Sequence, residues 1–234
     1  TSPPLIEEGR LTVPKLLRIH DYQTAAIGKW HLGRTWHLLD DSAPVSVQNI
    51  DWTKPMINGA PQQGFDYYFG ICKPGWGFME NSTVPVAPTE PFDLSDIGPT
   101  LIGGNNMKGF QVPGYAHAQM LPTYIEKTEA FIERAAAAGK PFFLYWTPCT
   151  PHKPVVPNDA FKGKSGAGLY GDFVVELDDA VGRVLGALER NGVAGNSLVI
   201  FTADNGPETE AYDRARDEAH YSMGALRGVK RDVW

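Results

Sequence analysis

Apolar and polar residues follow two patterns along this chain: short continuous apolar runs, and longer stretches in which apolar residues recur at helical spacing. The short runs predict strands, at 23–27, 142–146 and 197–202. The runs "FFLYW" and "SLVIFT" in the last two are typical of strands buried on both faces of a sheet. The helical spacing predicts three helices, at 12–21, 122–138 and 169–191. Because helix and strand alternate, the pattern indicates one α/β domain over 1–234, with a largely parallel sheet sandwiched between helices.

A long excursion, from 34 to 121, interrupts this pattern. It is rich in Pro, Gly and aromatic residues and carries turn signals such as "NGAP" and "KPGWG", so we expect mostly irregular backbone with short strands. An excursion of this length usually builds a functional surface. Its Trp36, Trp52 and Trp76 could stack on a bound ring or form the core of the loops, and we favour the core.

Composition limits the classes of function. The 234 residues are 42% hydrophobic, as in a globular protein, and carry a formal net charge of -6 from interspersed acidic and basic residues. No basic tract predicts binding to nucleic acid or to a membrane surface, and no apolar run approaches the roughly 20 residues that span a bilayer. The two cysteines, Cys72 and Cys149, are too few for a disulfide framework and lack the spacing of metal ligands. The oligomeric state stays open.

Polar residues follow each of the three predicted strands. They are Lys29 and His31 after the first, Cys149, Thr150, His152 and Lys153 after the second, and Asp204 and Asn205 after the third. In open α/β sheets, ligands bind outside the carboxyl ends of the strands. If the strands are parallel neighbours, all three clusters therefore meet at one edge of the sheet.

The residue types in these clusters suit one kind of chemistry. Asp204 and Asn205 offer hard oxygen ligands, which fit Ca²⁺ or Mg²⁺ better than Zn²⁺. Lysine and histidine side chains offer cations and proton donors, which suit an anionic, oxygen-rich substrate and proton transfer to a leaving oxygen. The cationic candidates are Lys29, His31, His152 and Lys230.

Each candidate also has a plainer interpretation. "DNG" after a strand is often a simple turn, His152 could be a solvated loop histidine, and Lys29 could be a surface lysine. Cys149 is better explained as a small buried hydrophobe than as a nucleophile. His117 is expected to be structural or exposed. Only the joint placement of the clusters at strand ends favours a site.

Segments along nearly the whole chain resemble landmarks of the sulfatase family, in the family's order. They are "IGKWHLG" (27–33), "GFDYYFG" (64–70), "PFFLYW" with "PHKP" (141–154), the helix at 170–192, "VIFTADNG" (199–206) and "LRGVK" (226–230). The resemblance implies the alkaline-phosphatase-like fold and the hydrolysis of a sulfate ester to an alcohol and sulfate.

The resemblance implies a role for each matching residue. Lys29 and Lys230 resemble the lysines that hold the sulfate oxygens. His31 resembles the histidine that assists turnover near the nucleophile, and His152 resembles the histidine that protonates the leaving alcohol oxygen. A lysine and a histidine two residues apart in an extended segment point to the same side, so Lys29 and His31 can hold one tetrahedral anion together.

The resemblance also implies a divalent cation. Asp204 and Asn205 resemble two of its ligands, with Ca²⁺ as the expected ion and Mg²⁺ as the alternative. The paired aspartates of the family's first strand have no counterpart, because Asp40 and Asp41 lie after "GKWHLG".

The family's nucleophile is missing from this sequence. It is a formylglycine made from the cysteine of Cys-x-Pro-Ser-Arg, and no such motif occurs. "CTPHK" at 149–153 has similar spacing, but His152 there occupies the place of the leaving-group histidine. We therefore expect an incomplete catalytic domain that lacks the first strand, the nucleophile loop with its formylglycine, and the C-terminal subdomain.

Three functional hypotheses remain. The first is a sulfuric ester hydrolase of arylsulfatase type, acting on a small-molecule or carbohydrate sulfate ester. The second is a phosphate or phosphonate ester hydrolase of the same superfamily, and the third is a non-catalytic truncated homologue. The resemblance implies a periplasmic, extracellular or lysosomal location, although no signal peptide is visible in the sequence.

Overall fold

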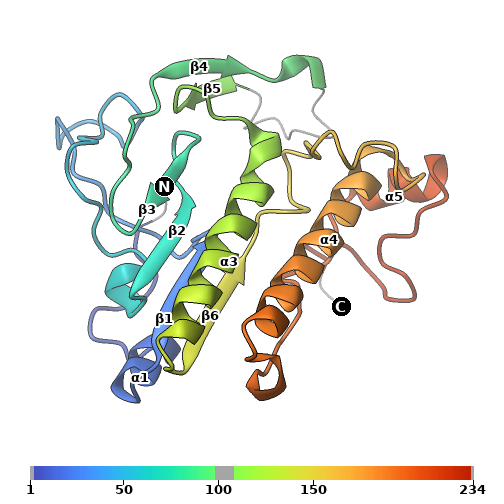
Figure 1. The fold of residues 1–234 in the computed structure, drawn as a ribbon. Coiled ribbons are helices and arrows are strands. Elements are labelled where there is room, and N and C mark those ends of the chain that lie inside the picture. Colours follow the sequence, from blue (N-terminus) through green and yellow to red (C-terminus); the bar gives the residue numbers. More distant parts are fainter. Residues whose placement is uncertain (1–2, 98–107, 233–234) are drawn as a thin grey trace.

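The computed structural model describes residues 3–97 and 108–232 and is built around a four-stranded sheet (Figure 1). Its strands are β1 (Gln23–Gly28), β2 (Tyr67–Ile71), β3 (Phe78–Glu80) and β6 (Phe142–Thr147), in the order β3-β2-β1-β6. Strand β1 lies in the middle and runs parallel to both β2 and β6, whereas β3 is antiparallel to β2. The prediction of an α/β protein with a largely parallel sheet is confirmed.

The two faces of β1 bury alternate residues in two cores. On one face, Ala25 and Ile27 pack with Phe131 of α3 (Met120–Ala137). On the other face, Ala26 packs with Trp36, in the loops that follow the strand. Figure 1 shows α3 lying along β1 and β6 on the helical side of the sheet. The sheet therefore sits between a helical layer and a layer of irregular chain.

The predicted helices are present with small shifts in their ends. They are α1 (Val13–Ile19), α3 and α4 (Gly168–Arg190). Thr12 caps α1, because its side chain accepts a hydrogen bond from the Lys15 amide. Helix α4 lies beside α3 and is tied to it by Arg183, which pairs with Glu129 at 2.6 Å. Within the described residues, no helix is both long and apolar enough to cross a membrane.

The excursion at 34–121 is mostly irregular, as predicted. Besides β2 and β3 it holds the antiparallel pair β4 (Glu90–Asp93) and β5 (Lys108–Gln111). Short 3-10 turns occur here and later, as η1 (Pro61–Gln63), η2 (Ser95–Ile97), η4 (His117–Gln119) and η5 (Ala194–Asn196). Trp36 and Trp76 are buried and Trp52 is partly buried against the same core as Trp36, so the preference for loop core is confirmed.

The predicted strand at 197–202 is wrong. This segment pairs with no strand of the described sheet, and its apolar side chains are exposed, with Leu198 88%, Ile200 78% and Phe201 72% accessible. The reason is a groove of about 2740 Å³ that separates it from β6 and is lined by both segments. A strand needs a partner for its backbone groups, and this segment has none across the groove.

The same groove explains why β6 is less buried than predicted. The sequence indicated burial on both faces, but β6 is only half-buried and its Tyr145 is 44% exposed. Strand β6 is paired with β1 along one edge and borders the groove along the other. Its free edge therefore faces the groove.

Gly28 ends β1 at a point where a side chain has no room. Its φ of 125° lies in the region that favours glycine, and a Cβ there would sit 2.0 Å from the Thr147 carbonyl oxygen. The absence of a side chain lets the end of β1 lie directly against the end of β6.

We predict that Gly28→Ala lowers the free energy of unfolding by about 2 kcal/mol or more, because the clash and the positive φ act together. Gly182→Ala is the matched control, since Gly182 lies in α4 with open space around it. Alanine in a helix is expected to raise stability there by about 0.5–1 kcal/mol. Urea unfolding measures both, and equal stability of the two variants would contradict the close approach.

Candidate functional site

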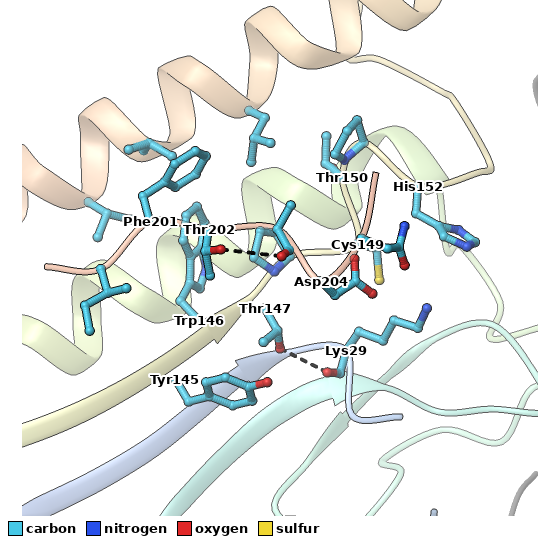
Figure 2. A pocket seen from close by; sticks show the side chains of 18 of the residues that line it. Lys29, Tyr145, Trp146, Thr147, Cys149, Thr150, His152, Phe201, Thr202 and Asp204 are labelled. Atoms are coloured by element: carbon cyan, nitrogen blue, oxygen red, sulfur yellow. Dashed lines mark hydrogen bonds between the residues drawn. The ribbon is translucent and has the colours of Figure 1, made fainter. Parts of the chain in front are cut away.

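Lys29 is fixed at the end of β1 by a double link to the end of β6. Its amide donates to the Thr147 carbonyl at 2.7 Å, and the Thr147 hydroxyl donates back to the Lys29 carbonyl at 3.0 Å, as Figure 2 shows for the second bond. The next residue, Trp30, is buried and donates its indole N–H to the Gly33 carbonyl at 2.8 Å. Because Trp30 turns into the core, Lys29 and His31 are left on the opposite side of the backbone.

His152 stands on a tight turn that follows β6. Its amide donates to the Cys149 carbonyl at 2.7 Å, and its ring Nδ1 lies 2.6 Å from the carbonyl oxygen of Lys153. A carbonyl can only accept, so Nδ1 must carry the proton in this contact. The other ring nitrogen, Nε2, is left to exchange a proton with a ligand.

The third cluster lies across the groove from β6. Asp204 and Asn205 are exposed, and Lys230 is held close to them because its amide donates to the Pro207 carbonyl at 2.7 Å. Figure 2 shows Lys29, Cys149, His152 and Asp204 gathered at one end of the pocket, while Tyr145 and Phe201 lie toward the other end. All six predicted site residues line this one groove: Lys29, His31, His152, Asp204, Asn205 and Lys230.

The cations of the site act on one another. Loss of hydration lowers the pKa of His31 below its usual value, and the charges of Lys29, His152 and Lys230 lower it further. Loss of hydration is also the largest cause that lowers the pKa of His152; the bond to Lys153 opposes it, while Lys29 and Lys230 add to it. These four side chains line the same groove, and their charges act on one another there.

The lysines of this cluster form few ion pairs. In the part of the chain that the structure describes, Lys29 makes no ion pair, and Lys230 pairs only with Glu208, at 3.4 Å. Positive groups that repel one another are stabilised by a bound anion. The arrangement can therefore hold an oxyanion between two lysines and two histidines and can deliver a proton to it.

Comparison with known proteins decides the family. The family model described as Sulfatase matches residues 2–229. The chain belongs to the sulfatase family.

Individual sulfatases resemble the chain over most of its length. N-acetylgalactosamine-6-sulfatase of Sus scrofa is 32% identical over 195 residues, which cover 83% of this chain and 32% of that protein. N-acetylgalactosamine-6-O-sulfatase of Bacteroides thetaiotaomicron is 28% identical, in an alignment that covers 100% of this chain and 50% of that protein.

A solved structure shares the fold. It comes from work on the metabolism of multiple glycosaminoglycans by Bacteroides thetaiotaomicron and superimposes with a TM-score of 0.76 at 25% identity. The match covers 98% of this chain and 53% of that one. The chain thus spans about a third to a half of the length of these relatives.

Asp204 and Asn205, the two residues expected to bind a metal ion, supply only part of the donor set that a divalent cation needs. Asp204 and Asn205 lie side by side at the groove with a carboxylate and an amide oxygen, which is the donor type that Ca²⁺ and Mg²⁺ prefer. Two oxygens do not complete either coordination shell. Over residues 3–97 and 108–232, no three His, Cys, Asp or Glu residues come together as a metal-binding group. The donors fit the ion in kind but not in number.

Cys149 does not have the features of a nucleophile. Burial raises the pKa of its thiol, although Lys29 and Lys73 act in the opposite direction. It therefore holds its proton at neutral pH and packs against the apolar cluster under α3. This agrees with the interpretation of Cys149 as a small hydrophobe rather than a nucleophile, but its side chain is only partly buried.

Lys73 is a residue near the site that the sequence pattern did not indicate. Its Nζ lies 3.1 Å from the ring centroid of Trp76, and loss of hydration lowers its pKa to about 7. The charge of Lys29 lowers the pKa of Lys73 further, so the two amino groups act on each other. The only signal in the sequence is a lysine between Cys72 and Pro74 in a loop of apolar and turn-forming residues.

We predict that Lys29→Met raises the ring pKa of both His31 and His152, because Lys29 lowers both. Two-dimensional NMR of the imidazole resonances as a function of pH measures the two values separately. The control is Lys162→Met, since Lys162 pairs with Asp159 and should leave both histidines unchanged. If both pKa values stay the same in Lys29→Met, the cationic cluster is not formed as described.

Proposed function

We propose that this chain is the sulfate-binding part of a sulfuric ester hydrolase, which converts a sulfate ester and water to an alcohol and sulfate. The observation that carries the proposal is the convergence of Lys29, His31, His152 and Lys230 on one groove, with His152 held in a defined tautomer. The family supports the same reaction.

The residues of the chain divide the work between binding and proton transfer. Lys29 and Lys230 hold the sulfate oxygens and stabilise the negative charge that builds on them as the sulfur–oxygen bond breaks. Protonated His152 donates from Nε2 to the leaving alcohol oxygen, while Nδ1 stays bound to the Lys153 carbonyl. His31 lies on the same side as Lys29 and offers a further hydrogen-bonding group to the anion.

The nucleophile comes, in this proposal, from a part of the sulfatase outside these 234 residues. The groove between β6 and 197–202 supports this, because it exposes a free strand edge on one side and apolar side chains on the other. Burying each of those side chains under one added strand would contribute about 1.5–3 kcal/mol. Such a strand would end beside Lys29 and carry the formylglycine loop to the anion.

Asp204 and Asn205 are proposed to hold a divalent cation, Ca²⁺ or alternatively Mg²⁺, together with ligands from outside this chain. When bound, the ion supplies positive charge that draws electron density from the oxygens of the nucleophile and sulfate. The exposed position of both side chains at the groove supports the assignment.

The proposed substrate is a sulfated carbohydrate. The relatives named N-acetylgalactosamine-6-sulfatase support this class. Most of the tryptophans of the excursion are committed to the core, so they do not form an aryl pocket. We further propose a location outside the cytoplasm, because the resemblance to the family implies one.

In the full-length protein, His152→Ala should lower the rate of hydrolysis of esters with poor leaving groups by about 10²- to 10⁴-fold. Activated aryl sulfates should lose far less, because their leaving oxygen needs no proton. The control is His20→Ala, at the exposed end of α1. Steady-state kinetics on the two substrate types gives the ratio, and equal losses on both would remove His152 from the role of general acid.

Asp204→Asn should weaken Ca²⁺ binding by the full-length protein by about 10- to 100-fold or more, since the loss of an outer partner alone costs that much. Isothermal titration calorimetry measures the affinity. Asp213→Asn is the matched control, because Asp213 lies nearby on α5 (Glu210–Asp217) but pairs with Arg216. Unchanged affinity in Asp204→Asn would show that the cation binds elsewhere.

A further inference from the structure

The segment 207–210 contacts Lys230 and also Lys153, the neighbour of His152. It directly follows Gly206 and the Asp204–Asn205 pair and leads into α5. The Pro207 carbonyl accepts from the Lys230 amide at 2.7 Å, and Glu208 pairs through Oε1 with the Lys230 ammonium at 3.4 Å. The second oxygen of Glu208 accepts a hydrogen bond from the Arg231 guanidinium. The Glu208 carboxylate thus binds the side chains of Lys230 and Arg231, while the neighbouring Pro207 carbonyl binds the Lys230 backbone.

Glu210 acts on the His152 segment in a similar way. Its carboxylate pairs with the ammonium of Lys153, and both side chains are only about a fifth exposed, at 20% and 21%. The carbonyl oxygen of the same Lys153 accepts from Nδ1 of His152. Glu210 therefore anchors the residue that orients the imidazole and sets its tautomer.

We propose that Glu208 and Glu210 are positioning residues of the anion site, Glu208 for Lys230 and Glu210 for the Lys153–His152 contact. This inference rests on the proposed function, because it assigns the two carboxylates to the binding of the same oxyanion. Neither touches the reacting atoms. Together they join Lys230 and the His152 turn to the segment of Asp204 and Asn205.

The burial of these pairs separates them from ordinary surface ion pairs. Lys162 and Asp159, for comparison, lie 2.6 Å apart with side chains 49% and 91% exposed. Exposed pairs of that kind contribute little, because water and salt screen them. Glu208 and Glu210 are each about a quarter exposed or less, and each partner is itself part of the site or adjoins it.

The direction in which sulfate affinity changes when the charge of Glu208 is removed distinguishes a positioning role from simple charge repulsion. The negative charge of Glu208 by itself repels sulfate, so its removal would strengthen sulfate binding if charge were all that mattered. If Glu208 instead holds Lys230 in place, its removal weakens sulfate binding in spite of the gain in positive charge.

The test uses the isotope-labelled 234-residue chain titrated with inorganic sulfate, with the ring resonances of His31 and His152 as the reporters. We expect Glu208→Gln to raise the sulfate dissociation constant about tenfold, as the loss of an outer partner does at other sites. Glu208→Asp should restore much of the affinity. Glu133→Gln, on the exposed side of α3, removes the same charge and should leave the constant unchanged. Equal or tighter binding in Glu208→Gln overturns the role of Glu208.

Glu210 is tested by the tautomer of His152. In the unaltered chain, the ring nitrogen shifts above the pKa should show the proton on Nδ1. We expect Glu210→Gln to give a mixture of the two tautomers, whereas Glu210→Asp keeps the Nδ1 form. An unchanged tautomer in Glu210→Gln overturns the role of Glu210, and a merely structural role would not move this signal in a folded variant.

A failure of the proposed function gives a different result. If sulfate leaves the histidine resonances of the unaltered chain unchanged, the anion site itself is contradicted. Glu208 is then judged from hydrogen exchange at the Lys230 amide, which Glu208→Gln should speed about tenfold if the turn is loosened. An unchanged exchange rate overturns the positioning role without reference to sulfate.

Discussion

The site depends on the double link between Lys29 and Thr147. One backbone bond and one hydroxyl bond join the ends of β1 and β6, and Gly28 has no Cβ to keep them apart. The parallel register of the two strands runs along all six residues and ends at this contact. The loop with His31 and the turn with His152 therefore begin from the same point, whatever their own sequences are.

Charge is the second constraint. Partial loss of hydration lowers the pKa of His31 and His152, and the charges of Lys29 and Lys230 lower both further. A cluster of this kind is unfavourable by itself and becomes favourable when an anion occupies it. Binding and folding should therefore be coupled at this edge of the sheet. Glu208 supplies part of the missing negative charge without blocking the groove.

The sequence pattern correctly predicted the elements that depend mainly on local residues. Strands β1 and β6, helices α3 and α4, and the convergence of the predicted site residues all agree with the apolar runs and with the polar residues at their ends. The run at 197–202 has the same pattern but forms no strand, because strand formation depends on a partner that the local pattern does not contain. Strand β2 was hidden in the irregular excursion, although "YYFGI" pairs directly with β1.

The acidic residues were the hardest to predict. Glu208 and Glu210 stand in "PETE", which is typical of a solvated surface segment. Glu208 pairs with Lys230, 22 residues later in the chain, and Glu210 pairs with Lys153, 57 residues earlier. Lys73 was missed for a related reason, since its burial against Trp76 depends on the packing of the whole loop.

A crystal structure of the full-length protein grown with sulfate tests the central claim most directly. The account predicts one tetrahedral anion in contact with Lys29, His31, His152 and Lys230, at the end of a groove filled by an added strand between β6 and residues 197–202. An anion bound away from these four side chains, or a groove in which β6 pairs directly with 197–202, would contradict it.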